Sequence, residues 1–158
     1  MISKDVEGNE YEVVANDLTW RPSAYSIVIR DNAILLVKEN DKYHLPGGGI
    51  DIGEDPKIAA MREVKEETGC TVRDPKLIDL ASSFFSFGAF DNPPNLQHVQ
   101  SLLFYYACEY VSTDTSDMHL DEYEEASGLA PEWVDLGELD AIIVGTTVDW
   151  RPVIRKYC

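Results

Sequence analysis

Residues 48–70 read GGIDIGEDPKIAAMREVKEETGC, and the signals in this segment predict one helix. Asp is a favoured N-cap and Pro is favoured at the first helical position, so Asp55 and Pro56 mark the start. Gly69 marks the end after Thr68, because glycine readily adopts the left-handed backbone conformation found just beyond helix C-termini. We therefore expect a helix from Pro56 to Thr68 with a loop on each side.

Three glutamates lie close together on one face of this predicted helix. At about 100° per residue, Glu63, Glu66 and Glu67 fall on one side, with Ala59 among them. The apolar side consists of Ala60, Met61, Val64 and Thr68. Helix neighbours three or four positions apart have Cβ atoms about 5–6 Å apart, so the carboxylates can share a hard cation such as Mg²⁺ or Mn²⁺. The small Ala59 side chain leaves room for a ligand above the acidic face.

A solvated surface helix is the alternative, and composition alone favours it, since Glu and Lys are good helix formers. The placement of the charges argues against it. Glu63 and Glu67 form a like-charge pair at i, i+4, which costs a few tenths of a kcal/mol, roughly, without a counter-ion. Glu66 and Glu67 also lie near the helix C-terminus, where the dipole disfavours negative charge. A bound cation would reverse both effects, so the pattern favours a metal site.

Strands are predicted on both sides of this segment. Residues 24–30 and 33–39 are apolar and β-branched, and Asp31 and Asn32 between them suit a tight hairpin turn. Residues 46–49 read PGGG and predict a loop whose glycines let the backbone approach a ligand closely. Further strands are expected at 77–87, 98–111 and 132–134, with a turn at 91–95, a helical turn at 136–140 and a C-terminal helix at 149–157. This order predicts a mixed α/β architecture with helices packed on a mixed sheet.

Length and charge restrict the partners and the location. The chain of 158 residues suits a single domain over residues 1–158. Its net charge of −16 repels nucleic acid polymers and anionic membranes, so we expect neither as a partner. An anionic substrate would need a local cation. No apolar run approaches the roughly 20 residues that span a bilayer, and the N-terminus lacks the apolar core of a signal peptide, so we expect a cytoplasmic protein.

The cysteines predict no zinc site. Cys70, Cys108 and Cys158 are far apart and form no CxxC pair, a pattern that fits reduced thiols. Cys70 and Cys108 have apolar neighbours and are expected in the core, whereas Cys158 is expected to be exposed.

The acidic helix and its flanks resemble a known motif, the Nudix box G-x5-E-x7-R-E-U-x-E-E-x-G-U, in which U is a bulky apolar residue. Five residues separate Gly48 from Glu54, and seven more lead to residues 62–70, REVKEETGC. Every fixed position matches. The one departure is Cys70, where Ile, Leu or Val is usual. The preceding residues 45–47, LPG, also look typical of the family.

Resemblance to the Nudix (MutT-like) hydrolase superfamily implies an α/β/α sandwich with a mixed β-sheet and a catalytic loop–helix–loop. It also implies hydrolysis of the diphosphate linkage in a small nucleoside diphosphate derivative, such as a nucleoside triphosphate, a nucleotide sugar or ADP-ribose. By this resemblance, Glu63, Glu66, Glu67 and the backbone carbonyl of Gly47 would bind Mg²⁺ or Mn²⁺. A homodimer is among the assemblies that the resemblance allows.

The resemblance assigns further roles around the metal site. Arg62 and Glu54 would pair and orient the catalytic helix. The general base would be Glu63 or a carboxylate from a later loop, for which Glu122, Glu124 and Glu125 are candidates as a group. Taken singly, each of these three suits a solvated loop better than the site.

The substrate is not determined by sequence. A Pro about 16 residues past the box would indicate an ADP-ribose type, but residues 85–87 read FSF. The motifs for NADH, coenzyme A and dinucleoside polyphosphates are absent too. Phe85 could stack on a base, although packing in the sheet is the alternative, and Arg21 could contact a phosphate or lie on the surface. Two classes of function remain: a metal-dependent pyrophosphohydrolase, favoured by the complete set of glutamates, and a non-catalytic nucleotide-binding or sensor module.

Overall fold

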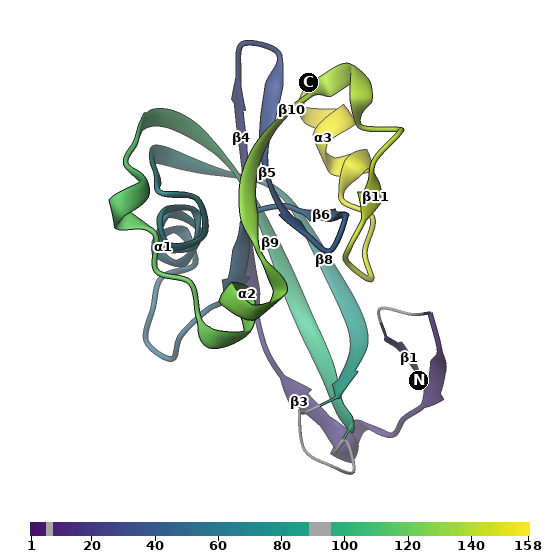
Figure 1. Ribbon diagram of the computed structural model, residues 1–158. Helices are drawn as coiled ribbons and strands as arrows, with labels where there is room; N and C mark the ends of the chain where they lie inside the picture. Colours follow the sequence, from purple (N-terminus) through teal and green to yellow (C-terminus); the bar gives the residue numbers. More distant parts are fainter. Residues whose placement is uncertain (6–7, 89–95) are drawn as a thin grey trace.

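A strongly curled, mixed β-sheet forms the centre of the protein in a computed structural model that describes residues 1–5, 8–88 and 96–158 (Figure 1). The neighbouring strands β6, β5, β4, β9 and β8 form its middle. Their bounds are Lys42–His44, Ala33–Glu39, Ser23–Arg30, Leu96–Thr113 and Cys70–Gly88, respectively. The expected turn at 91–95 lies outside the described residues.

Strand pairing makes the sheet mixed. β4 runs antiparallel to β5, as the predicted turn at Asp31 and Asn32 requires, and parallel to β9, with Ala24 opposite Phe104. β8 and β9 form a long antiparallel pair that begins earlier than the predicted strand, at Cys70. At the edges, β11 (Ile143–Val144) follows β6, and β1 (Ile2–Lys4) and β2 (Glu10–Glu12) follow β8. Two further strands pair with inner strands: β3 (Leu18–Trp20) with β9 and β10 (Ala130–Asp135) with β5. The three N-terminal strands were not predicted, because each has only three residues.

Helices cover both faces of the sheet, and each face has its own core. α1 (Pro56–Thr68) and α3 (Arg151–Tyr157) lie on opposite sides of it (Figure 1). On β4, Ala24 and Val28 belong to the cluster beneath α1, whereas Ile27 belongs to the cluster that contains α3 residues. A strand buried on both faces is apolar at successive positions rather than at every second one. The predicted α/β/α sandwich is confirmed.

α1 begins and ends where its capping residues predict. Asp55 accepts a hydrogen bond from the Lys57 backbone N–H (2.8 Å), and Gly69 has φ +67°. The expectation for Ala59 was wrong: its side chain is fully buried in the core rather than beside a ligand space. Small residues here let α1 approach β4 so closely that the Ser26 hydroxyl donates to the Ala60 carbonyl (2.9 Å).

The glycines before α1 form a strand instead of the expected loop. β7 (Gly47–Gly49) pairs antiparallel with the start of β4. Gly47 has φ +150°, and a Cβ on it would lie 2.7 Å from the Tyr25 Cα. Glycine is thus needed here for close contact between two strands, and this contact fixes the position of β7 beside the helix.

A short helix replaces the loop expected around the later glutamates. α2 (Glu122–Ser127) starts with a capping box: the Asp121 carboxylate accepts from the Glu124 N–H and the Glu124 carboxylate accepts from the Asp121 N–H, both at 2.8 Å. The D-x-x-E spacing was therefore a readable signal for this helix.

The C-terminal region agrees with prediction. β10 contains the expected strand at 132–134, and a 3₁₀ turn, η3 (Leu136–Glu138), and α3 follow. Cys70 and Cys108 are buried and Cys158 is exposed, all as free thiols. Among the described helices, none combines the length and apolar character needed to cross a membrane.

We expect the Ile34→Val variant to lower the free energy of unfolding by about 1 kcal/mol, because it removes a methylene from a side chain with 0% exposure and leaves a small cavity. Ile143→Val, on a side chain 60% exposed in another strand, is the matched control and should change stability by less than about 0.5 kcal/mol. Urea unfolding monitored by circular dichroism measures both, and equal losses would contradict the proposed core.

Candidate active site

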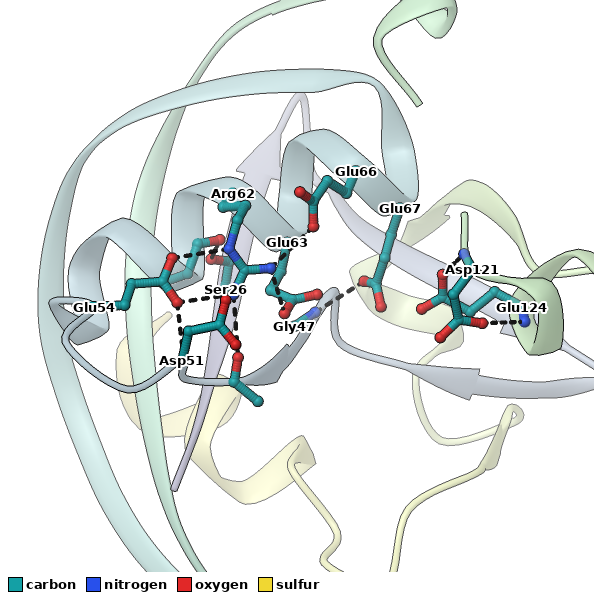
Figure 2. A network of polar contacts seen from close by, with 12 residues as sticks. Ser26, Gly47, Asp51, Glu54, Arg62, Glu63, Glu66, Glu67, Asp121 and Glu124 are labelled. Atoms are coloured by element: carbon teal, nitrogen blue, oxygen red, sulfur yellow. Dashed lines mark hydrogen bonds and ion pairs between the residues drawn. The ribbon is translucent and has the colours of Figure 1, made fainter. Parts of the chain in front are cut away.

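Arg62 is the centre of an ion-pair network that joins α1 to the segment before it (Figure 2). Its Nε and Nη2 donate to the two carboxylate oxygens of Glu54 at 2.8 and 2.9 Å, and Nη2 also donates to the Gly49 carbonyl (3.1 Å). Its Nη1 donates to Glu63 (2.8 Å) and Glu66 (2.9 Å). These hydrogen bonds lower the pKa of Glu54 and raise that of Arg62, so both stay charged.

Glu67 is the most deeply placed carboxylate of the site. It is 6% exposed, and its Oε2 accepts from the Gly47 backbone N–H at 2.9 Å. Burial raises its pKa well above the usual value, and the charge of Glu63 raises it further. Burial also raises the pKa of Glu63, although Arg62 partly opposes this effect. The positive charge near these two carboxylates is therefore too small to offset the cost of burying their ionised forms.

The donor set fits a hard divalent cation. Three carboxylates at i, i+3 and i+4 supply the oxygen ligands that Mg²⁺ and Mn²⁺ prefer, and a cation would favour the ionised forms of Glu63 and Glu67. Across residues 1–5, 8–88 and 96–158, no three acidic, His or Cys side chains already converge in metal-binding geometry. Arg62 instead holds Glu63 and Glu66 through one nitrogen.

The glycine at position 48 brings backbone and carboxylate together. A Cβ on Gly48 would lie 2.8 Å from Glu63 Oε1, so a larger residue here would displace this carboxylate. β7 thus lies directly against the acidic face of α1, with the Gly47 N–H already bonded to Glu67.

The carboxylates line a cavity of about 1030 Å³. Arg21 and Phe85, the two residues expected to contact substrate, line it as well, as does Glu124. Burial raises the pKa of Glu124. Glu122 and Glu125 do not line this cavity and are exposed, so α2 brings only one of its three glutamates to the site. The reason is geometric, since side chains on a helix this short still point in different directions around its axis.

Sequence reasoning missed several residues of the cavity wall. Glu39 and His44, at the ends of β5 and β6, both line it, with His44 Nε2 3.5 Å from Glu39 Oε2. Tyr25 and Thr146 line it too. These residues come from different parts of the chain, and nothing in their local sequence distinguishes them from ordinary strand or loop residues. Asp121, by contrast, was marked by the capping box.

Residues 20–154 match the NUDIX domain family. The chain belongs to this family. The match includes every residue of the acidic helix and most of the cavity wall. The predicted resemblance is thereby confirmed for nearly the whole fold, not only for the motif.

Named relatives of this NUDIX domain agree with the prediction of a hydrolase that acts on phosphorus anhydrides. An RNA pyrophosphohydrolase from Sphingopyxis alaskensis is 29% identical over 140 residues, 80% of this chain and 85% of the relative. An ADP-ribose pyrophosphatase from Methanocaldococcus jannaschii is 39% identical over 62 residues, 36% of this chain and 37% of the relative. In several other curated relatives, the matched segment is only 23–28% of their length.

A solved NUDIX hydrolase structure from Nitrosomonas europaea superposes with a TM-score of 0.65 and 23% identity, covering 88% of each chain. At that identity, the likeness shows the fold alone. It agrees with the mixed sheet and the helices on its two faces.

Proposed function

We propose that this NUDIX domain is a divalent-metal-dependent pyrophosphohydrolase that cleaves the diphosphate linkage of a small nucleoside diphosphate derivative. One observation carries the proposal: Glu63, Glu66 and Glu67 face the same cavity as the cationic Arg21. A diphosphate is a dense anion, so a cavity for it needs both metal-binding carboxylates and a cationic side chain. The NUDIX family and the relatives named above support the same reaction type.

Each residue has a distinct task in this proposal. Mg²⁺ or Mn²⁺, when bound, would neutralise the charge of the diphosphate and act as a Lewis acid. Arg62 orients Glu63 and Glu66, and it ties Glu54 to the helix. The Gly47 N–H orients Glu67, while the Gly47 carbonyl remains a proposed ligand.

Proton removal from the attacking water falls to a carboxylate, either Glu63 or Glu124. Both line the cavity, and burial raises the pKa of Glu124, which makes it a stronger base than an exposed glutamate. In this proposal Arg21 contacts a phosphate. Its position against the backbone of β7, with its Nη2 3.1 Å from where a Gly49 Cβ would be, supports that role.

Two other candidates remain, and a named relative supports the first of them. The relative named as an RNA pyrophosphohydrolase points to RNA as the substrate, although the net charge of −16 opposes binding of a polymer. A nucleotide-binding module without catalysis would use the same cavity but would not need three metal-binding carboxylates.

We expect hydrolysis of at least one member of a substrate panel in Mg²⁺, with cleavage between two phosphorus atoms. The panel contains nucleoside triphosphates, ADP-ribose, nucleotide sugars, dinucleoside polyphosphates and a short 5′-triphosphorylated RNA. EDTA should lower the rate by more than about 100-fold, because without a bound cation the negative carboxylates would repel the diphosphate. Added Mg²⁺ or Mn²⁺ should restore the rate. Product analysis by ion-exchange chromatography measures both effects. Saturable binding without turnover of any compound would favour the binding module instead.

A further inference from the structure

A second, smaller pocket opens beside the acidic cavity. Its volume is about 200 Å³, and it shares Arg21, Tyr25 and Phe85 with the cavity wall. Its other walls are mainly apolar or aromatic and include Leu103, Tyr105 and Trp150. Tyr25 and Tyr105 stack with their ring centroids 5.8 Å apart. Flat aromatic walls of this kind suit a planar apolar group.

The pocket is closed on one side by the segment that leads into α3. The Gly145 N–H donates to the Tyr43 carbonyl (2.9 Å), and the Thr147 hydroxyl lies 3.3 Å from that of Ser83. These contacts fasten the segment to β6 and β8, so the pocket is a fixed part of the fold.

Trp150, one of the residues that line this pocket, carries a buried hydrogen-bond donor that no described residue pairs. The residue is 2% exposed, and its indole Nε1 has no hydrogen-bond partner among the described residues. Buried polar atoms are nearly always paired in folded proteins, because an unpaired one loses its bond to water without replacement. An unpaired donor on a residue that lines a pocket therefore points to an acceptor on a ligand.

The order of chemical groups along the acidic cavity and the adjoining pocket matches the order of the parts of a nucleotide. Carboxylates lie at one end, Arg21 and Phe85 at the junction, and the apolar pocket with Trp150 at the other end. A sugar would bury many hydroxyl groups against apolar walls, which is unfavourable, whereas a heteroaromatic base offers flat faces and acceptors in its plane.

We infer that Trp150 is a specificity-determining residue, whose indole N–H donates to a ring nitrogen or exocyclic oxygen of the substrate's nucleobase in this pocket. The inference deepens the proposed function and rests on it for the position of the diphosphate. It places the base against Tyr25, Phe85 and Tyr105. It also predicts discrimination between bases, because a base that presents an amino group at this position would meet the indole donor with another donor.

The test is a metal-free titration of ¹⁵N-labelled protein with AMP, GMP, CMP and UMP, and with ribose 5-phosphate as the control without a base. The chain has three tryptophans, so three indole N–H signals are expected. Trp20→Phe and Trp133→Phe assign them by elimination. We expect the Trp150 signal to shift in a saturable manner with at least one nucleotide and not with ribose 5-phosphate.

Trp150→Phe keeps a ring and removes the donor. It should weaken binding of the preferred nucleotide about tenfold and make the four nucleotides bind more equally, while Trp133→Phe, outside the pocket, should do neither. If Trp150→Phe does not fold, the shift of the Trp150 indole signal in the wild-type protein is the test of the inference. A nucleotide that binds without moving the Trp150 signal, or no nucleotide binding at all, would overturn the inference. Monophosphates have no diphosphate to cleave, so this outcome is independent of whether hydrolysis is observed.

Discussion

Replacing Glu67 by Gln should reduce kcat for diphosphate hydrolysis on the order of 10³-fold without weakening the fold. Gln keeps an oxygen that can accept from the Gly47 N–H but loses the charge that would bind a divalent cation. Because burial already disfavours the ionised form of Glu67, removing the charge should not lower the free energy of unfolding of the metal-free protein. Steady-state kinetics and thermal unfolding measure the two quantities.

Matched controls lie on the neighbouring helix. Glu122→Gln and Glu125→Gln make the same chemical change on exposed side chains that do not line the cavity, so kcat should change less than twofold, roughly, as for other surface substitutions. Glu66→Gln should behave like Glu67→Gln, since both carboxylates belong to the proposed metal site. Full activity in either Glu66→Gln or Glu67→Gln would show that the metal-site proposal is wrong.

The second large effect is expected from Gly69→Ala, which should lower the free energy of unfolding by about 3 kcal/mol. Gly69 has φ +67°, and a Cβ there would lie 2.6 Å from the Asp114 carbonyl oxygen and 2.9 Å from the Thr115 Cα. Both contacts are with backbone, which cannot rotate away. The substitution must therefore separate the end of α1 from the segment at 114–115.

Gly128→Ala separates the two causes of this loss. Gly128 has a similar φ of +72°, but a Cβ added there would meet no atom within 4 Å, so only the backbone strain of about 1 kcal/mol should appear. Urea denaturation of the two variants at one temperature gives the comparison. Equal losses would mean that the contact with Asp114 does not constrain the helix end.

Sequence alone predicted the parts of the protein that depend on interactions between residues close together in the chain. The ends of α1 depend on a cap at Asp55 and a left-handed residue at Gly69, both visible in the chain. The pairing of Arg62 with Glu54, which the resemblance to the Nudix box implied, spans only eight positions. The acidic face of α1 follows from helical periodicity.

Other local inferences failed because they needed knowledge of the neighbours. Ala59 falls among the glutamates on a helical projection, yet it is buried because β4 and α1 approach closely there. The glycines at 47–49 permit a loop, but pairing with β4 makes them a strand. Glu122, Glu124 and Glu125 were candidates only as a group, and the orientation of α2 decides that Glu124 is the one that lines the cavity.

The sequence by itself determined the family motif, the acidic helix and the type of cation that its carboxylates suit, because these depend on spacings within a few turns of chain. Only the tertiary structure decided what surrounds the helix. Arg21, Phe85 and Trp150 come from segments far apart in the chain, and strand pairing brings them to adjoining spaces. The position of each depends on the register of several strands at once, and no local signal in a single chain encodes that register.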